Sequence, residues 1–365
     1  MVILNSYMEQ LRNIYWQGGR AIAVLIILLL SITRQVQAED VVSPSYQWGR
    51  GYHIPAYHLT LGGYTKAAYS SFENGLQEAG LDDLSLFISW SPFSRLQLFS
   101  ELELEDLFTL NGVSSFDNAF KVERLYANFL INDEFKVRFG KILTPFSRWN
   151  LLHAAPLVWT SSRPMITKGY VVPQHSTGLS AHYNGSLFNR DFSATLFADD
   201  SADLELTSDE HGFNYAFGGR LNYQLSQELN IGSSFVSAQI ETEDNADWQY
   251  TLGVDFLWQK NQFELQLESF FNLNSSPSTH NKYGVYLQGV APLFKHFFAV
   301  GRYEYMYGNE NNDVVQLQAE SIHVGVVGLV WRPAPPLALK VEYRFGKNNQ
   351  FNAPSGVLTS IAMFF

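Results

Sequence analysis

The feature that most constrains the fold is an alternation of apolar and polar residues with a period of two. The segment 248–258 alternates aromatic or aliphatic residues with Gln249, Thr251 and Asp255, and the segment 337–345 alternates them with Lys340 and Glu342. Successive side chains of a β-strand point to opposite faces, so each segment has one apolar and one polar face. The alternation predicts an all-β protein.

Sixteen alternating segments follow one another: 57–69, 81–90, 95–105, 120–131, 135–141, 176–184, 191–199, 212–224, 230–240, 248–258, 262–272, 282–290, 297–307, 318–331, 337–345 and 357–365. Short connections such as 91–94 and 132–134 alternate with long polar ones such as 106–119 and 200–211. Strands of about 9–11 residues cross a membrane at a tilt, and bacterial outer-membrane barrels have short turns at one rim and long loops at the other. We therefore predict a transmembrane antiparallel β-barrel of about 16 strands over residues 57–365.

A soluble sandwich of two sheets also alternates, but its aromatic residues are spread through a core. Here Trp90, Trp258, Trp331 and Tyr343 fall near predicted strand ends, as in the aromatic girdles at membrane interfaces. The terminal strand ends at Phe365, which resembles the C-terminal assembly signal of bacterial outer-membrane barrels. A bilayer also requires a closed sheet, since it tolerates no open edge. These features favour the membrane barrel.

The N-terminus has the pattern of a secretory signal peptide. An apolar run from Ala21 to Leu30 follows Arg12 and Arg20, and Ala38 stands where a signal peptidase would cut. Ten apolar residues are too few to span a bilayer, which needs about 20, although a short anchor or a buried helix is the alternative. We expect a signal peptide over 1–38, a short periplasmic segment over 39–56, and export to the outer membrane of a Gram-negative bacterium.

Composition excludes several classes of function. The chain has no Cys, which excludes disulfides, thiolate metal sites and a Cys nucleophile. Its net charge of -11 disfavours nucleic acid as a partner. No zinc-protease, nucleophile-elbow or phosphate-loop motif is present. We therefore expect no cofactor, no metal and no nucleic acid.

The longest connection, residues 142–175, is less polar than a solvated loop should be. It contains Phe146, Trp149, Trp159 and Met165. A long loop without regular structure is usually functional or disordered, and this apolar content argues against disorder. We expect the loop to fold into the barrel and narrow the lumen. Its charged residues and its central histidine are the expected constriction residues: Arg148, His153, Arg163 and Lys168.

The run from Val137 to Ser147, V-R-F-G-K-I-L-T-P-F-S, resembles bacterial porins of the phosphate-selective type. The resemblance implies that the third long loop, 142–175 here, folds inward to line the constriction, and that the subunits form homotrimers. The chain departs from the phosphate-selective pattern in lacking a dense ladder of Arg and Lys along its strands.

Alternation also assigns residues to the lumen, because Arg or Lys facing lipid at the midplane costs about 2–4 kcal/mol. The expected lumen-lining charges are Glu101, Glu103, Lys136, Arg138, Arg220, Arg302, Glu304, Lys340 and Arg344. Opposed basic and acidic groups would set a field across the constriction that orients polar solutes. The alternative for any one of them is local pairing on a wet wall.

We expect no enzymatic activity. Ser180 and His182 share the inner face of one segment, as in barrel-borne hydrolases, but residues two apart on a strand lie about 7 Å apart and need not meet. The sequence instead predicts a porin, a water-filled channel for passive diffusion of small hydrophilic solutes or inorganic ions through the lipid outer membrane. The basic loop suggests a weak anion preference, since charges at the narrowest point act within a Debye length of about 8–10 Å. A closed barrel serving as a structural anchor or adhesin is the second hypothesis.

Overall fold

The computed structural model describes residues 43–109, 112–113, 120–167, 171–200, 212–240, 248–274, 281–308, 321–347 and 353–365. Residues Pro44–Phe365 form one compact unit built almost wholly of strands. Its helical pieces are η1 (Pro55–Tyr57), α3 (Arg148–Leu151) and η2 (Met165–Thr167). Within the described residues, every helix is too short or too polar to cross a membrane.

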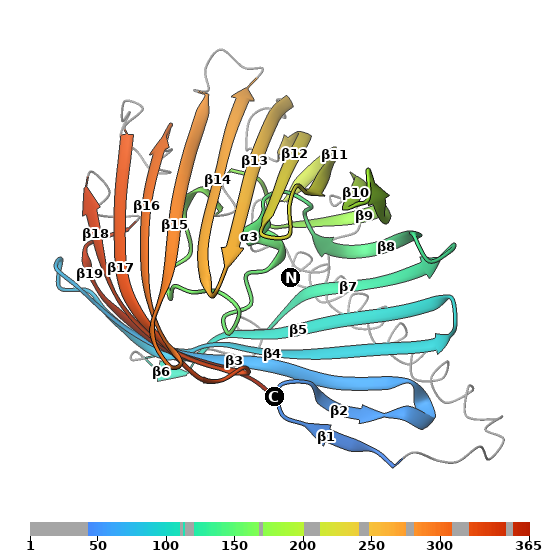
Figure 1. The fold of residues 1–365 in the computed structure, drawn as a ribbon, viewed down its shortest axis with the longest axis horizontal. Coiled ribbons are helices and arrows are strands. Elements are labelled where there is room, and N and C mark those ends of the chain that lie inside the picture. Colours follow the sequence, from blue (N-terminus) through green and yellow to red (C-terminus); the bar gives the residue numbers. More distant parts are fainter. Residues whose placement is uncertain are drawn as a thin grey trace, which may run out of the picture. The chain divides into compact units, whose positions relative to one another are not determined.

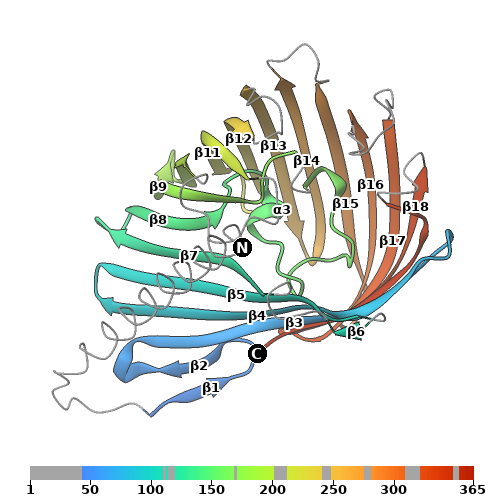
Figure 2. The same cartoon turned by 180° about the vertical axis from the view of Figure 1, so that it is seen from behind.

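Sixteen strands form the wall: β3 (Leu59–Phe72), β4 (Gln77–Phe93), β5 (Leu96–Thr109), β7 (Phe120–Leu130), β8 (Phe135–Leu143), β9 (His175–Leu187), β10 (Arg190–Asp199), β11 (Phe213–Gln224), β12 (Leu229–Ile240), β13 (Trp248–Lys260), β14 (Phe263–Asn274), β15 (Lys282–Phe294), β16 (Phe297–Tyr307), β17 (Ser321–Ala334), β18 (Leu337–Lys347) and β19 (Gly356–Phe364). Each strand pairs antiparallel with the next (Figure 1). The last strand, β19, pairs with β3, and this pairing closes the barrel (Figure 2). The prediction of an antiparallel barrel of about 16 strands is confirmed.

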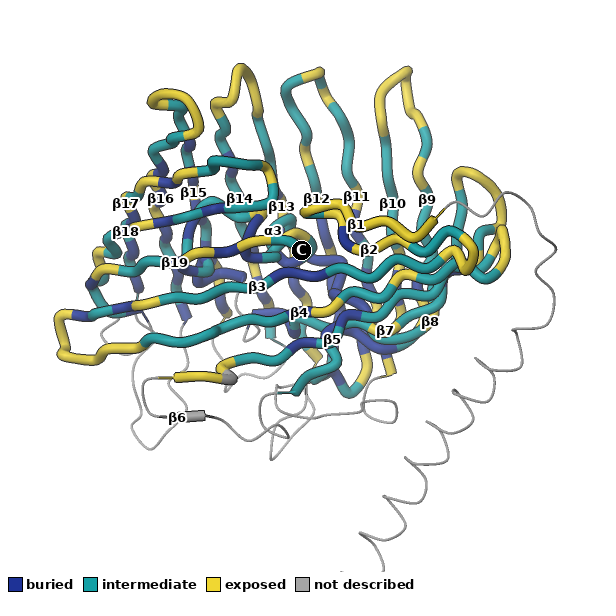
Figure 3. The backbone as a smooth tube through the Cα atoms, turned by 90° about the horizontal axis from the view of Figure 1, so that it is seen from below, coloured by how far each residue is buried: buried dark blue, intermediate teal, exposed yellow. Residues whose placement is uncertain are grey.

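The two faces of the wall differ as a membrane barrel requires. On β13, Val254 is 55% exposed on the outer face while its neighbour Asp255 is 5% exposed on the inner face. The same alternation of exposed apolar and buried polar residues recurs along the other strands, as Figure 3 shows by burial. An outer surface of large apolar side chains around buried polar groups is the reverse of a soluble sandwich. The two-sheet alternative is therefore wrong.

The closing seam depends on a close approach of two backbones. Phe365 donates its N–H to the carbonyl of Gly63 (2.9 Å), and Gly63 donates in return to Phe365 (3.2 Å). A Cβ at Gly63 would lie 2.0 Å from the carbonyl oxygen of Ser85 on β4 and 2.7 Å from the ring of Phe365. Only glycine fits there, so both the pairing of β3 with β4 and the seam with Phe365 require Gly63.

Three short strands lie outside the predicted set. The hairpin of β1 (Ser45–Gln47) and β2 (Gly51–Ile54) adds to β3, and β6 (Gly112–Val113) pairs with the end of β5. The hairpin covers part of the segment 39–56 that we expect to be periplasmic. The expected signal peptide, 1–38, lies outside the described residues.

Candidate functional site

The segment between β8 and β9, residues 144–174, carries the candidate site. Figures 1 and 2 draw α3 within the ring of strands from opposite sides. The segment shares an apolar cluster with inward-facing side chains of the wall strands β10–β17, whose buried members are Phe146, Met165, Ile166, Val171, Val172, Phe197, Phe213, Ala216, Val236, Ala238, Phe270, Tyr286, Met306, Ile322, Val324, Val326 and, outside both elements, Ala353. Phe146 fits over Gly253, where a Cβ would lie 2.9 Å from the ring. Burial of this cluster holds the segment to that part of the wall.

Three wall glutamates on alternate strands accept backbone hydrogen bonds from the segment. Glu268 on β14 accepts from the N–H groups of Arg148 and Trp149 (both 2.9 Å), which begin α3 and have no partner within that helix. Glu342 on β18 accepts from Ser161 (2.8 Å) and Ser162 (2.9 Å). Glu304 on β16, between them, accepts from the N–H of Met165 (2.5 Å). The three carboxylates therefore fix three separate points of the segment.

Wall cations bind the carbonyl groups of the same segment. Lys340 donates to the carbonyls of Ala155 (2.7 Å) and Thr160 (3.2 Å). Arg332 donates to the carbonyl of Pro156 (2.7 Å), and Arg302 to that of Ser162 (3.0 Å). Buried backbone groups need partners, and here charged wall side chains supply them.

The two arginines of the segment are engaged with protein groups. Arg148 forms an ion pair with Asp255 (3.1 Å), which also pairs with the predicted lumen residue Arg220 (2.6 Å). Arg163 lies over the ring of Trp149 at 4.8 Å and donates to oxygens of Gln174 and Thr167. Lys168, the third cation expected in the constriction, lies outside the described residues.

Glu123 on β7 joins the segment to the opposite wall. Its carboxylate lies 3.3 Å from Nε2 of His153 and 3.0 Å from Nε2 of His175, and accepts from the amide of Gln174 (2.8 Å). Sequence analysis missed Glu123, because an irregularity in the pairing of β5 with β7 at Glu101 interrupts the alternation there. Because of this irregularity, the next residue, Arg124, also lies on the inner face, where it pairs with Glu101.

The remaining predicted lumen residues all lie on the inner face. Glu103 accepts from Ser85 (2.8 Å) and Tyr64 (3.1 Å), and Arg302 pairs with Glu304 (2.7 Å). Lys136 and Arg138 project from β8, and Arg344 donates to the carbonyl of Pro354 (2.9 Å).

Ser180 and His182 meet after all, with Oγ 2.9 Å from Nε2, while Nδ1 of His182 lies 3.2 Å from the hydroxyl of Thr195. Among the described residues, no carboxylate bonds the imidazole, and Ser180 is 2% exposed. The arrangement lacks the accessible, activated nucleophile of a hydrolase.

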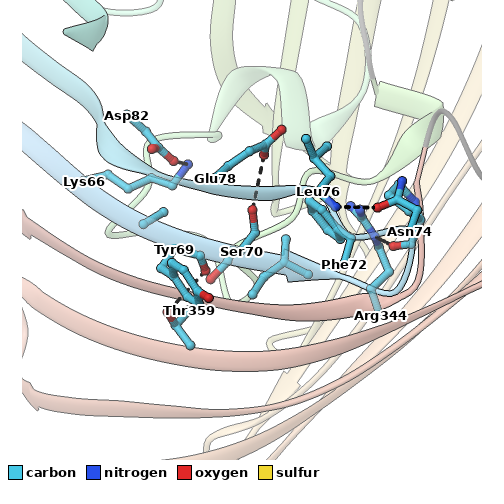
Figure 4. Close-up of a pocket in the computed structure, with 14 residues that line it drawn as sticks. Lys66, Tyr69, Ser70, Phe72, Asn74, Leu76, Glu78, Asp82, Arg344 and Thr359 are labelled. Carbon is cyan, nitrogen blue, oxygen red and sulfur yellow. Dashed lines mark hydrogen bonds and ion pairs between the residues drawn. The ribbon is translucent and has the colours of Figure 1, made fainter. Parts of the chain in front are cut away.

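An open space borders the other side of the segment. A cavity of about 440 Å³ lies between β3, β4, β18 and β19 and touches the segment at Ser161. Figure 4 shows Lys66 with Asp82, Ser70 with Glu78, and Arg344 around it. Its lining combines charged and hydroxyl side chains with apolar ones such as Phe72 and Leu358, whereas the cluster on the opposite side is apolar, so this part of the interior can accept water and polar solutes.

No protein-family model matches the chain. An uncharacterized protein of Aquifex aeolicus (strain VF5) is 23% identical over 328 residues, which cover 78% of this chain and 75% of that one. Among solved structures, the outer membrane channel DcaP of Acinetobacter baumannii superposes with a TM-score of 0.61 at 12% identity, over 87% of this chain and 100% of that one. An anion-selective porin from Comamonas acidovorans gives 0.60 at 14%, over 84% and 99%. OmpT, an outer membrane protein of Vibrio cholerae solved in a trimer form, gives 0.57 at 10%, over 84% and 98%.

These likenesses establish the fold. The chain is a closed 16-stranded antiparallel barrel of the porin type. At such low identities the activity must be argued from the residues of this chain.

Proposed function

We propose that this protein is an outer-membrane channel through which small hydrophilic solutes or ions diffuse, and that residues 144–174 form its constriction. The observation that carries the proposal is the binding of this segment to inner-face charges of one wall, with a polar cavity on its other side. A barrel of 16 strands is wide enough for an aqueous channel, so a segment fixed inside it sets the size of the path.

A homotrimer and a weak preference for anions are parts of this proposal. The resemblance of residues 137–147 to phosphate-selective porins supports both, and OmpT of Vibrio cholerae is described as a trimer. The described part of the segment carries Arg148 and Arg163 and no carboxylate of its own, although Asp255 of the wall compensates the charge of Arg148. Selectivity for phosphate in particular has less support, because the inner wall carries many glutamates among its cations.

The test is single-channel recording of the refolded protein in a planar bilayer under a KCl gradient. Ohmic steps in groups of three, with a reversal potential that marks chloride over potassium, are the expected result. A folded and inserted barrel that carries no current would refute the channel and leave the closed-barrel anchor as the function.

A further inference from the structure

Several cations in the barrel interior, on the wall and in segment 144–174, have their charge compensated by a carboxylate at close range. The pairs are Lys66 with Asp82, Arg124 with Glu101, Arg148 and Arg220 with Asp255, and Arg302 with Glu304. A paired cation exerts a weak field on a passing solute, because the two charges nearly cancel beyond their own separation.

Lys136 and Arg138 on β8 lack such a carboxylate partner. Among the described residues, no carboxylate oxygen lies within ion-pair distance of either side chain. Their cross-strand neighbours on β7 and β9 are uncharged at neutral pH: Leu130 and His182 beside Lys136, and Asn128 and Ser180 beside Arg138. These two side chains therefore form a locally uncompensated positive patch in the lumen.

Arg138 is also held in place. Its Nε donates to Oδ1 of Asn128 (2.7 Å), and its guanidinium lies 3.8 Å from the centre of the Tyr126 ring, which stacks on Phe99. One edge and one face of the guanidinium are thus occupied, while its two terminal NH₂ groups have no protein partner among the described residues. An immobilised guanidinium with free N–H groups is suited to oxyanions, because little side-chain entropy is lost on binding.

A neutral donor lies beside the patch. His182 contacts the hydroxyls of Ser180 and Thr195 through its two nitrogens. A neutral imidazole has one N–H, so one of these hydroxyls accepts from it and keeps its own hydrogen for another partner.

We propose that Lys136 and Arg138 form a binding step for small oxyanions, carboxylates or phosphates, along the diffusion path. This inference rests on the proposed channel and names its solute class. The two residues stand two apart on one strand, so their stems lie about 7 Å apart, and an oxyanion between them reaches both cations. The selectivity of the channel then arises on the wall at β8 in addition to the loop.

The test compares Lys136→Gln and Arg138→Gln with Lys121→Gln, which removes the same charge from a lysine that has a carboxylate partner, Glu105, at 2.6 Å. In planar bilayers at constant ionic strength, inorganic phosphate or acetate is expected to reduce the KCl conductance in a saturable way. Each patch substitution should raise the half-blocking concentration about tenfold, the equivalent of one contact of about 1.4 kcal/mol. Lys121→Gln should leave the half-blocking concentration unchanged. Block by acetate identifies a site for carboxylates as well as phosphates, and block by phosphate alone restricts the site to phosphoryl groups.

Absence of saturable block by either anion, or an equal effect of Lys121→Gln, would overturn the inference while leaving the channel intact. Calorimetric titration of phosphate or acetate into the detergent-solubilised protein compares the anion affinities of the same variants and does not depend on channel conductance. A barrel that carries no current but binds either anion in a Lys136-dependent way would refute the channel and retain the site. Loss of binding in all variants and in the parent protein would refute the site.

Discussion

Glu342 is expected to hold Ser161 and Ser162 of segment 144–174, called the tip below, against the wall. Its carboxylate is 3% exposed and accepts two N–H groups, from Ser161 (2.8 Å) and Ser162 (2.9 Å). Hydrogen bonds to a charged group are worth about 1.5–3 kcal/mol each, so Glu342→Ala should weaken the attachment by about 3–6 kcal/mol. The fraction of time that the tip is detached then rises more than about 100-fold. Glu342→Gln keeps one acceptor oxygen and should have a smaller effect.

The measurement uses the absence of Cys from the chain. A single cysteine at Ser162, which is 7% exposed, reacts with a membrane-impermeant thiol reagent only when the tip opens. The labelling rate should rise steeply in Glu342→Ala and remain unchanged in Glu78→Ala, whose carboxylate accepts, among the described residues, only from the hydroxyl of the wall residue Ser70 (3.2 Å). Equal labelling in Glu342→Ala and the parent would refute the reasoning that this carboxylate fixes the tip.

Three further predictions follow from single contacts. Cysteines replacing Ser161 and Ser360, whose hydroxyl oxygens lie 2.7 Å apart, should form a disulfide on oxidation. The pair at Ser161 and Thr359 should remain reduced on a non-reducing gel, and its oxidation to the same extent would contradict the placement of the tip. Val327→Arg puts a charge on the outer face midway along β17, where Val327 is 53% exposed, and should lower the free energy of unfolding in vesicles by about 2–4 kcal/mol. An unchanged denaturation midpoint would mean that this face does not meet lipid. Gly63→Val should lower the yield of folded barrel, because its Cβ would lie 2.0 Å from the carbonyl oxygen of Ser85 on β4 and 2.7 Å from the ring of Phe365, and a normal yield by circular dichroism would refute that account.

The wall was predictable because a strand in a membrane barrel is a local pattern. Each of the sixteen predicted segments coincides with a wall strand, with ends differing by a few residues. Lipid on one face and polar groups on the other force alternation at every second residue, so the sequence records the fold directly.

The irregular pieces were not predictable in the same way. The strands β1, β2 and β6 are two to four residues long and show no periodicity. The shift that brings Glu123 and Arg124 both to the inner face arises from the pairing of β5 with β7 and not from either strand alone.

The candidate site also has features that the sequence predicts and features that depend on the tertiary structure. The sequence distinguishes the long apolar loop and the residues that face the lumen. It does not separate the charges that bond the loop from those that do not. In the alternation Lys340 and Glu342 resemble Lys136 and Arg138, yet of these four residues only Lys340 and Glu342 bond the loop backbone. Their partners lie about 180 residues away in the chain.

The sequence by itself thus determined the number of strands, their faces and the position of the long loop, because period-two alternation is set by the residue and its immediate neighbours. Only the tertiary structure decided which inner-face charges are neutralised by a carboxylate, which bind the loop and which do neither. Those outcomes depend on distances between side chains that are far apart in the chain and are brought together by barrel closure. At those distances, a carboxylate either compensates a cation or leaves its field in the channel.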